Sequence, residues 1–157
     1  MSIGTISVIA VGKFHSPYWA RAQADYVARL RRYTTITLIE VKDALGQGFS
    51  EKAAEAREGD SLLLAAASSR RLTALRPAGR GFDSPQFAAH LKRQLEIFGK
   101  LAFLVGGPSG LSPKVLSACH EQLSLSAMTL PHELARIVLF EQLYRAFTIL
   151  GSEKYHR

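Results

Sequence analysis

The residues that could carry chemistry gather in the C-terminal half of the chain, and the first group is a glycine-rich loop. The sequence GGPSG occupies residues 106–110, directly after an apolar run. Glycine lacks a side chain, so such a loop lets the backbone approach a ligand closely. The loop has neither the Gly-Lys-Ser/Thr of a P-loop nor the acidic partner of a dinucleotide fingerprint. Its residues alone are compatible with a ligand cradle or with a simple tight turn.

A second candidate segment, SAMTLP, occupies residues 126–131. Pro131 disfavours the helical conformation at Leu130, so the backbone here should be irregular. Amide and carbonyl groups left free by such irregularity can bind an adenine edge and a ribose. The alternative is an ordinary strand end whose proline leads into a helix.

The third candidate is the terminal sequence Tyr155-His156-Arg157. A tyrosine ring can stack on a base, an arginine can pair with phosphate or a carbonyl oxygen, and histidine titrates near neutral pH. These are useful groups for handling a flipped-out base. The alternative is a frayed terminus without a function, which is common at chain ends.

These segments must be positioned by strands and helices that alternate along the chain. Short apolar or alternating runs predict strands, and Ser or Ser-Pro pairs predict helix starts. The alternation predicts one α/β domain over residues 1–157, with a mostly parallel sheet and helices on both faces. The expected strands are residues 3–11, 36–41, 71–75, 101–105 and 123–128, and the expected helices begin after Ser16, Ser50, Ser84, Ser112 and Pro131.

The order of these elements predicts where a ligand should bind. Parallel sheets bind ligands outside the carboxyl ends of their strands. Three segments should therefore meet at one edge of the sheet: the loop RPAGRGFD after Leu75, the glycine loop, and residues 126–131.

The charge of the chain favours a polyanionic partner. Twenty Lys and Arg residues outweigh 13 Asp and Glu residues, which gives a formal net charge of +7. Such a field suits nucleic acid, although surface charge that only confers solubility is the alternative. The residues suited to a phosphate-binding surface are Arg29, Arg31, Arg32, Arg70, Arg71, Arg76, Arg80, Lys92 and Arg93.

Several other classes of protein are disfavoured by the sequence. No apolar run approaches 18 residues, and the N-terminus resembles a strand more than a signal peptide. A single cysteine, Cys119, cannot form an intramolecular disulfide or a cysteine metal cluster, and the histidines lack metal-ligand spacing. We expect no metal, no membrane association and a cytoplasmic location. Neither a GxSxG motif nor a defensible Ser/His/Asp set is present.

The order of these motifs resembles one family over essentially the whole chain. LVGGPSGLSP, then LSLSAMTLPHELARIVLFEQLYRAF and a final YHR are similar to the large-subunit rRNA methyltransferase H family of the SPOUT superfamily. The start, VIAVGK followed by YVARLRRY, agrees with this resemblance. Each motif alone would be weak, but the combination in this order and spacing is specific.

The resemblance implies a C-terminal trefoil knot, a homodimer, and S-adenosylmethionine as the methyl donor. It implies methylation of N3 of pseudouridine 1915 in helix 69 of 23S rRNA, in the assembled ribosome. Tyr155, His156 and Arg157 would serve the nucleotide, from one protomer into the pocket of the other. By matching positions, the residues that would contact the donor are Leu75, Gly107, Ser126, Ala127, Met128, Thr129, Leu130 and Pro131.

This sequence departs from the family pattern at three places. Ser109 replaces an expected glutamate, Arg76 stands where an acidic residue is common, and Glu153-Lys154 replaces a frequent His-Pro. The last departure concerns how the tail is held. We expect His156, or a water that it holds, to take the N3 proton, and Arg157 to stabilise a carbonyl oxygen or phosphate.

Other functions are compatible with the same features. A ribosome-associated binding module without enzymatic activity would use the same basic surface, and would bind ribosomes without affinity for S-adenosylmethionine. A SPOUT enzyme with another RNA target is a second alternative. A doubly wound nucleotide-binding domain is a third, although both phosphate fingerprints are missing.

Overall fold

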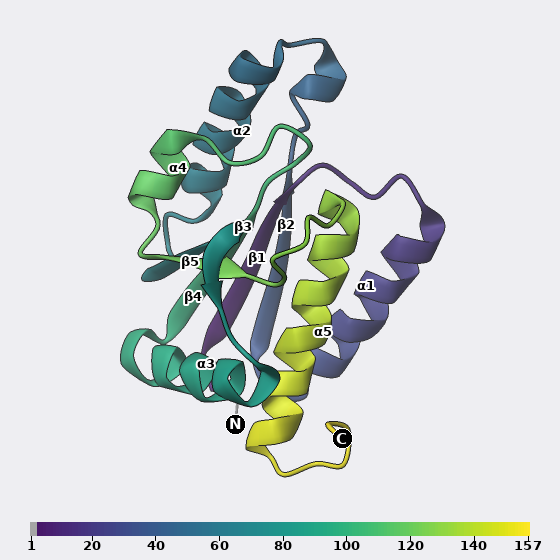
Figure 1. The fold of residues 1–157 in the computed structure, drawn as a ribbon, viewed down its shortest axis with the longest axis vertical. Helices are drawn as coiled ribbons and strands as arrows, with labels where there is room; N and C mark the ends of the chain where they lie inside the picture. Colours follow the sequence, from purple (N-terminus) through teal and green to yellow (C-terminus); the bar gives the residue numbers. More distant parts are fainter. Residues whose placement is uncertain (1–2) are drawn as a thin grey trace.

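The computed structural model describes residues 3–157, which form a wholly parallel sheet between two layers of helices (Figure 1). The strands stand in the order β2-β1-β4-β3-β5. This arrangement confirms the α/β class and the helices on both faces. The strands are β1 (Thr5–Val11), β2 (Thr35–Val41), β3 (Arg71–Gly81), β4 (Lys100–Val105) and β5 (Glu121–Ser124). The helices are α1 (Pro17–Leu30), the 3-10 turn η1 (Leu45–Gln47), α2 (Glu51–Ala65), α3 (Ser84–Phe98), α4 (Pro113–Ala118) and α5 (His132–Leu150).

The central strands β1 and β4 are buried on both faces, so their alternating side chains build two cores. Ile6 and Phe103 belong to the larger core, which faces α1, α3 and α5. Ile9 and Leu104 belong to the smaller core, which faces α2 and α4. The period of two along a strand explains why neighbouring residues enter opposite cores. The continuous apolar run predicted for β4 is a consequence of this burial on both sides.

The helix boundaries follow local capping chemistry. α5 covers His132–Leu150, as the sequence predicts, and Gly59, which could end a helix or lie within one, lies inside α2. A Cβ atom at Gly59 would lie 2.6 Å from Ser112 Oγ, so the missing side chain permits close packing beside α4. Asp83, not the expected Ser84, caps α3, because its side chain accepts from the Gln86 amide in a reciprocal capping box.

Two expectations at the sheet edge are wrong. The segment after Leu75, expected to be a loop, continues β3 to Gly81 with a register irregularity between Leu75 and Arg80. A Cβ atom at Gly79 would lie 2.7 Å from the backbone of Gln122, so only glycine lets β5 approach here. This close pairing extends the strand through a segment whose composition favours a loop.

The strand expected over residues 123–128 begins and ends earlier, at Glu121–Ser124. The preceding helix, α4, is predicted by the sequence to reach about Gln122. It ends at Ala118, because Cys119 takes an extended conformation. The His120 amide donates to the Leu72 carbonyl, and the Leu72 amide donates to His120 Nδ1. These bonds to β3 replace the last helical turn that the sequence predicts.

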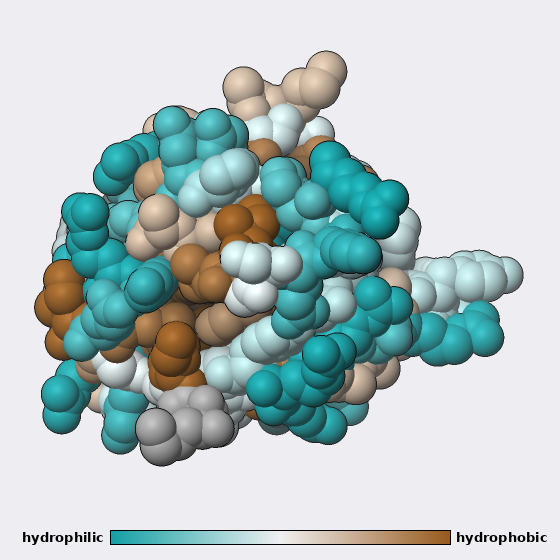
Figure 2. Space-filling view, turned by 90° about the horizontal axis from the view of Figure 1, so that it is seen from below, coloured by the Kyte–Doolittle hydropathy of each residue, from teal (hydrophilic) through white to brown (hydrophobic). Residues whose placement is uncertain are grey.

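The surface at the end that carries α3 and the tail combines hydrophilic and apolar areas. None of the helices within residues 3–157 is long and apolar enough to cross a membrane. Viewed from below, the end that carries α3 and the C-terminal tail is largely hydrophilic, with an apolar area enclosed within it (Figure 2). Ile97, near the end of α3, is among the exposed large apolar side chains.

A buried arginine joins α5 to the sheet. Arg136 is only 1% exposed, and its Nη1 lies 2.7 Å from Glu40 Oε2 of β2. Its Nη2 donates to the carbonyl oxygens of Val11 and Gly12, at the end of β1. Its guanidinium also lies over the Phe14 ring, 4.3 Å from the centroid. Arg136 therefore holds the first turns of α5 against the carboxyl ends of two strands.

A buried carboxylate stabilises the connection between β2 and α2. Glu58 is 1% exposed, and its Oε2 accepts from the Ala44 amide at 3.0 Å and from the Leu45 amide at 3.5 Å. Its Oε1 has no partner among the described residues. Burial disfavours the charged carboxylate and raises the pKa of Glu58 above its ordinary value, against the opposing effect of the two amides.

Replacement of Arg136 by methionine should strongly destabilise the protein. The substitution removes the cation, leaving Glu40 and two strand-end carbonyls without their donor. We expect Arg136→Met to lower the free energy of unfolding by about 3–5 kcal/mol in urea titrations. The exposed pair Lys114–Asp60 is the control, and Lys114→Ala should cost less than about 1 kcal/mol. Equal losses in the two variants would contradict this role of Arg136.

The raised pKa of Glu58 predicts a pH-dependent stability difference. The folded chain holds this proton more tightly than the unfolded chain. The stability that Glu58 contributes is therefore present below its unfolded pKa of 4.5, and is lost as pH rises through the higher folded pKa. The free energy of unfolding of wild type minus that of Glu58→Gln should fall as pH rises upward from 4.5. A difference that rises, or does not change, would contradict the assignment.

Candidate functional site

A cavity lies at the carboxyl ends of β3, β4 and β5. Its volume is about 510 Å³, which is within the range of small-molecule sites. Leu75 and the irregular part of β3 form one wall, the glycine loop forms another, and residues 125–131 with the first turn of α5 close it. The three segments that the sequence predicted to meet therefore do meet.

Most of the residues expected to contact a methyl donor line this cavity. Ala127 is the exception, because it is exposed but outside the lining. The expected residues that do line the cavity are Leu75, Gly107, Ser126, Met128, Thr129, Leu130 and Pro131. The structure thus brings these residues together, and their contact with a donor stays a prediction.

The glycine loop is folded too tightly for larger residues. Gly107 and Gly110 form an isolated antiparallel bridge, and the Gly110 amide donates to the Gly107 carbonyl. A Cβ atom at Gly106 would lie 2.8 Å from the Gly110 backbone, and one at Gly107 would lie 2.9 Å from Val11 Cγ1. The loop is therefore a tight turn whose backbone also forms a cavity wall, so the two interpretations of its sequence are compatible.

Two backbone donors in residues 125–131, which line the cavity, have no acceptor among the described residues. Ser126 uses its hydroxyl to accept from the Met128 amide, which bends the segment. Within residues 3–157, the amides of Thr129 and Leu130 have no protein acceptor. Pro131 provides no side-chain cap for α5, so the first amides of that helix are also uncapped at the cavity. Together these donors suit acceptor groups of a ligand, such as a carboxylate, a hydroxyl oxygen or a ring nitrogen.

Several lining residues were not among the individual residues predicted to contact the donor. Arg76 and Pro77 come from the part of β3 expected to be a loop, so the strand-end rule located that segment correctly. Leu116 of α4 and Ala135 of α5 add apolar surface. No motif marks these two positions, and only the packing of their helices shows them.

The cavity fits a methyl donor with an adenosine and an amino-acid part. Apolar side chains such as Leu116, Leu125 and Leu130 can cover a purine and a ribose carbon skeleton. The unpaired amides of Thr129 and Leu130 can bind heteroatoms that such a ligand presents. Of the described residues, no cluster of three His, Cys, Asp or Glu side chains could hold a metal ion.

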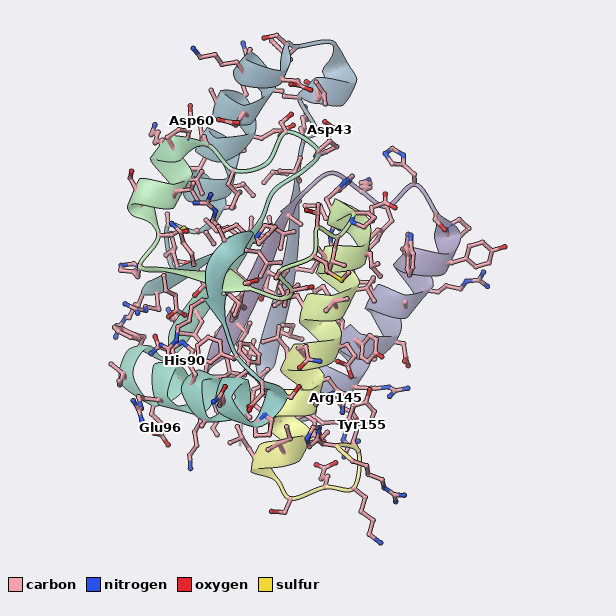
Figure 3. All side chains as sticks on the ribbon, in the orientation of Figure 1. Asp43, Asp60, His90, Glu96, Arg145 and Tyr155 are labelled. Carbon is pink, nitrogen blue, oxygen red and sulfur yellow. The ribbon has the colours of Figure 1, made fainter. Side chains whose placement is uncertain are left out.

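The tail packs against the other half of α5, where Arg145 and Tyr155 lie together (Figure 3). The Tyr155 hydroxyl donates to Glu141 Oε1 at 3.0 Å, and its ring meets the Tyr144 ring edge-on. Burial, with the hydrogen bonds to Tyr26 and Glu141, raises the pKa of Tyr155, so this phenol stays neutral. Arg157 is exposed and donates only to the Lys154 carbonyl.

Glu153 also holds the tail, by a contact that the sequence did not reveal. The Tyr33 hydroxyl donates to Glu153 Oε1 at 2.6 Å. Tyr33 lies two residues before β2, so this bond fixes the tail to the end of the sheet where the strands begin. At the place where Glu153-Lys154 replaces the His-Pro frequent in the family, Glu153 therefore anchors the tail by its own contact.

Within one protomer, the cavity lies at the carboxyl ends of the strands and the tail lies at their amino ends. Ala135 lines the cavity and Arg145 contacts the tail, and these residues are separated by roughly 15 Å along α5 at 1.5 Å per residue. None of Tyr155, His156 and Arg157 lines the cavity. The structure does not bring the two halves of the predicted site together within one chain.

The contact between Arg145 and His156 restricts the tautomer of the imidazole. Arg145 Nη1 lies 3.1 Å from His156 Nδ1. A guanidinium can donate but cannot accept, so Nδ1 must be the acceptor. The proton of neutral His156 then resides on Nε2, which makes this atom a hydrogen-bond donor.

Comparisons with known proteins agree with the sequence and the fold. Residues 5–156 match a family model described as "Predicted SPOUT methyltransferase". The chain is 41% identical over 152 residues to "Ribosomal RNA large subunit methyltransferase H" of Anaeromyxobacter dehalogenans, with 97% of this chain and 99% of the relative covered. A protein of the same name from Listeria welshimeri is 38% identical, with the same coverage.

Solved structures share the fold at low sequence identity. A probable methyltransferase from Bordetella pertussis superposes with a TM-score of 0.52 and 18% identity, over 90% of this chain and 95% of the other. A probable methylase family protein from Haemophilus influenzae gives 0.54 and 16%, over 98% and 69%. The chain therefore belongs to the SPOUT methyltransferase family, whose methyl donor is S-adenosylmethionine, and this confirms the family and the cofactor that the sequence indicates.

Proposed function

We propose that the chain transfers a methyl group from S-adenosylmethionine to large-subunit rRNA. The observation that carries the proposal is the 510 Å³ cavity, because its lining repeats the residues that the family resemblance assigns to the donor. The names of relatives at about 40% identity support an rRNA substrate. The finer target is N3 of pseudouridine 1915 in helix 69 of 23S rRNA, methylated in the assembled ribosome in the cytoplasm.

The donor site is assigned to the cavity. Leu75 and Leu130 would enclose the adenosine, and the Thr129 and Leu130 amides would bind its polar atoms. The uncapped start of α5 favours a negative group, such as the carboxylate of the donor. When bound, S-adenosylmethionine supplies a methyl group already activated by its sulfonium, so the protein mainly has to align the acceptor.

The acceptor site is assigned to the tail. Methylation at N3 requires loss of its proton, and the developing charge spreads over the two flanking carbonyl oxygens. His156 Nε2 carries a proton while Arg145 occupies Nδ1, so it would donate to one such oxygen. The N3 proton would then go to water. Of the two proton acceptors that the sequence allowed, His156 and a water that it holds, this favours the water. Tyr155 would orient the base and Arg157 would bind a carbonyl oxygen or phosphate.

The separation of the cavity and the tail supports a homodimer with shared sites. Tyr155 and His156 cannot reach their own cavity without leaving Glu141 and Arg145. A partner protomer could supply them to that cavity. The apolar area visible at the tail end of the molecule offers surface for contact with such a partner (Figure 2). The trefoil knot stays an expectation from the family.

Mass spectrometry of rRNA tests the substrate and the reaction together. Cells that lack the protein should lose one methyl group from one pseudouridine of the large-subunit rRNA, and wild type should restore it. Thr129→Trp should not restore it, because the indole would fill the donor cavity. Leu64→Trp is the control, since this side chain of α2 is exposed and lies outside the cavity lining. Unchanged rRNA in cells lacking the protein would contradict the proposal.

The role of the tail is tested separately from donor binding. Because a lost hydrogen bond to a developing oxyanion costs rate and not donor affinity, His156→Ala should lower kcat roughly 100- to 1000-fold. The Kd for S-adenosylmethionine, measured by calorimetry, should stay within about twofold. Lys154→Ala is the control within the tail. Wild-type turnover after removal of residues 155–157 would contradict the assignment.

A further inference from the structure

A second cavity lies between α3 and the strands β3 and β5, apart from the donor cavity. Its volume is about 280 Å³. Polar side chains converge on it from three elements: Arg71 and Thr73 of β3, Glu121 of β5, and His90 and Gln94 of α3. Five converging polar side chains beneath a helix are unusual for a solvent-filled crevice and need an explanation.

The carboxylate in this cavity already has all its partners. Glu121 accepts from Thr73 Oγ1 at 2.9 Å, and His90 Nε2 lies 3.0 Å from it. Arg71 Nη2 lies 3.6 Å away. Burial opposes the charged form of Glu121, but the hydrogen bonds from His90 and Thr73 outweigh it and hold the pKa below its ordinary value. The carboxylate therefore organises the wall and is not free to bind a ligand.

Two other buried polar atoms have no partner. Gln94 is only 8% exposed, and among the described residues neither its Oε1 nor Arg71 Nε has a hydrogen-bond partner. A buried polar group left without a partner is energetically unfavourable. Both residues line the cavity, beside the apolar side chains of Phe87, Leu91 and Leu101. The cavity thus places the amide side chain of Gln94 and the guanidinium of Arg71 beside an apolar surface, a combination that suits the edge and face of a nucleobase.

A basic hollow of about 410 Å³ adjoins this cavity. The hollow shares Arg80, Phe82 and His90 with the inner cavity and adds Arg93. The Phe82 ring stacks on His90 at 4.8 Å, and Arg80 lies 4.4 Å over the same ring. In the part of the chain that the structure describes, neither Arg80 nor Arg93 has an acidic partner within 4.0 Å. Two unpaired guanidinium groups in this hollow suit a phosphate.

We propose that the inner cavity and the basic hollow together form a second nucleotide site, which takes an unpaired base and phosphate of the RNA substrate. The proposal rests on the rRNA substrate proposed above. Arg76 lines the donor cavity and Arg80 lines the second site, four residues further along β3. At about 3.3 Å per residue this is at most roughly 13 Å, so one RNA strand can reach both sites. The second site would hold a neighbour of the methylated nucleotide.

The test uses uridine 5′-monophosphate as the probe, followed by NMR of the full-length protein. The probe should shift resonances of His90, Gln94 and Arg93, and Gln94→Leu should weaken binding at least about tenfold, since it removes the amide. Gln23→Leu is the matched control, because Gln23 is equally 8% exposed, also has an unpartnered Oε1, and lines none of the three cavities. Inorganic phosphate should bind more weakly than the nucleotide.

A second pair of variants keeps the proposal testable if Gln94→Leu does not fold. Arg93→Ala should weaken the probe, and Lys92→Ala, which removes a neighbouring cation paired with Glu96, should not. Shifts confined to the donor cavity, equal affinity of Gln94→Leu and wild type, or phosphate binding as tight as the nucleotide would overturn the proposal. Those results with normal methylation of rRNA would reject the second site alone. Absence of rRNA methylation by wild type would reject the proposed function instead.

Discussion

Arg136 is the largest fully buried side chain within residues 3–157, and its hydrogen bonds join α5 to the carboxyl ends of β1 and β2. The same end of β1 also contacts the glycine loop, because Gly107 packs directly on Val11. Both walls of the donor cavity therefore meet at one strand end. A buried cation is costly unless it is paired and hydrogen-bonded, and Glu40 and two carbonyls provide partners for Nη1 and Nη2, although Nε has none among the described residues. The geometry of the cavity depends on this contact, although Arg136 does not line it.

The parallel sheet explains why the cavity could be anticipated from the sequence. Every strand ends at the same edge, so residues that follow Leu75, Val105 and Ser124 must come together. The buried run of β4 and the helix α5 were predicted for the same local reasons that form them. The pairing of β3 with β5 was not, because the close approach at Gly79 and the bonds between His120 and Leu72 are tertiary contacts.

Other parts of the site have no local signal at all. The second cavity joins Arg71, Gln94 and Glu121, which are far apart in the chain and belong to no motif. The anchor between Tyr33 and Glu153 joins residues 120 positions apart. The exposure of Ala127 beside lining neighbours depends on the bend made by Ser126. In each case the arrangement in space, not the residue type, decides the role.

The separation of the donor cavity from the tail is the structural feature that matters most for the mechanism. The helix α5 links them, and its two halves serve different partners: Ala135 faces the cavity, while Glu141 and Arg145 hold the tail. A tail ordered by Glu141 and Glu153 needs little further ordering when it meets a substrate. Preorganisation of this kind suits a site assembled from two chains, in which each protomer presents a finished half.

Crosslinking from the tail tests this assembly most directly. A photoreactive phenylalanine analogue at position 157 would be activated in an equal mixture of isotope-labelled and unlabelled protein, and crosslinked peptides would be identified by mass spectrometry. The account predicts crosslinks from one chain to residues 105–111 or 125–131 of the other. Crosslinks only within one chain, to residues around Tyr33 and Glu141, would contradict it.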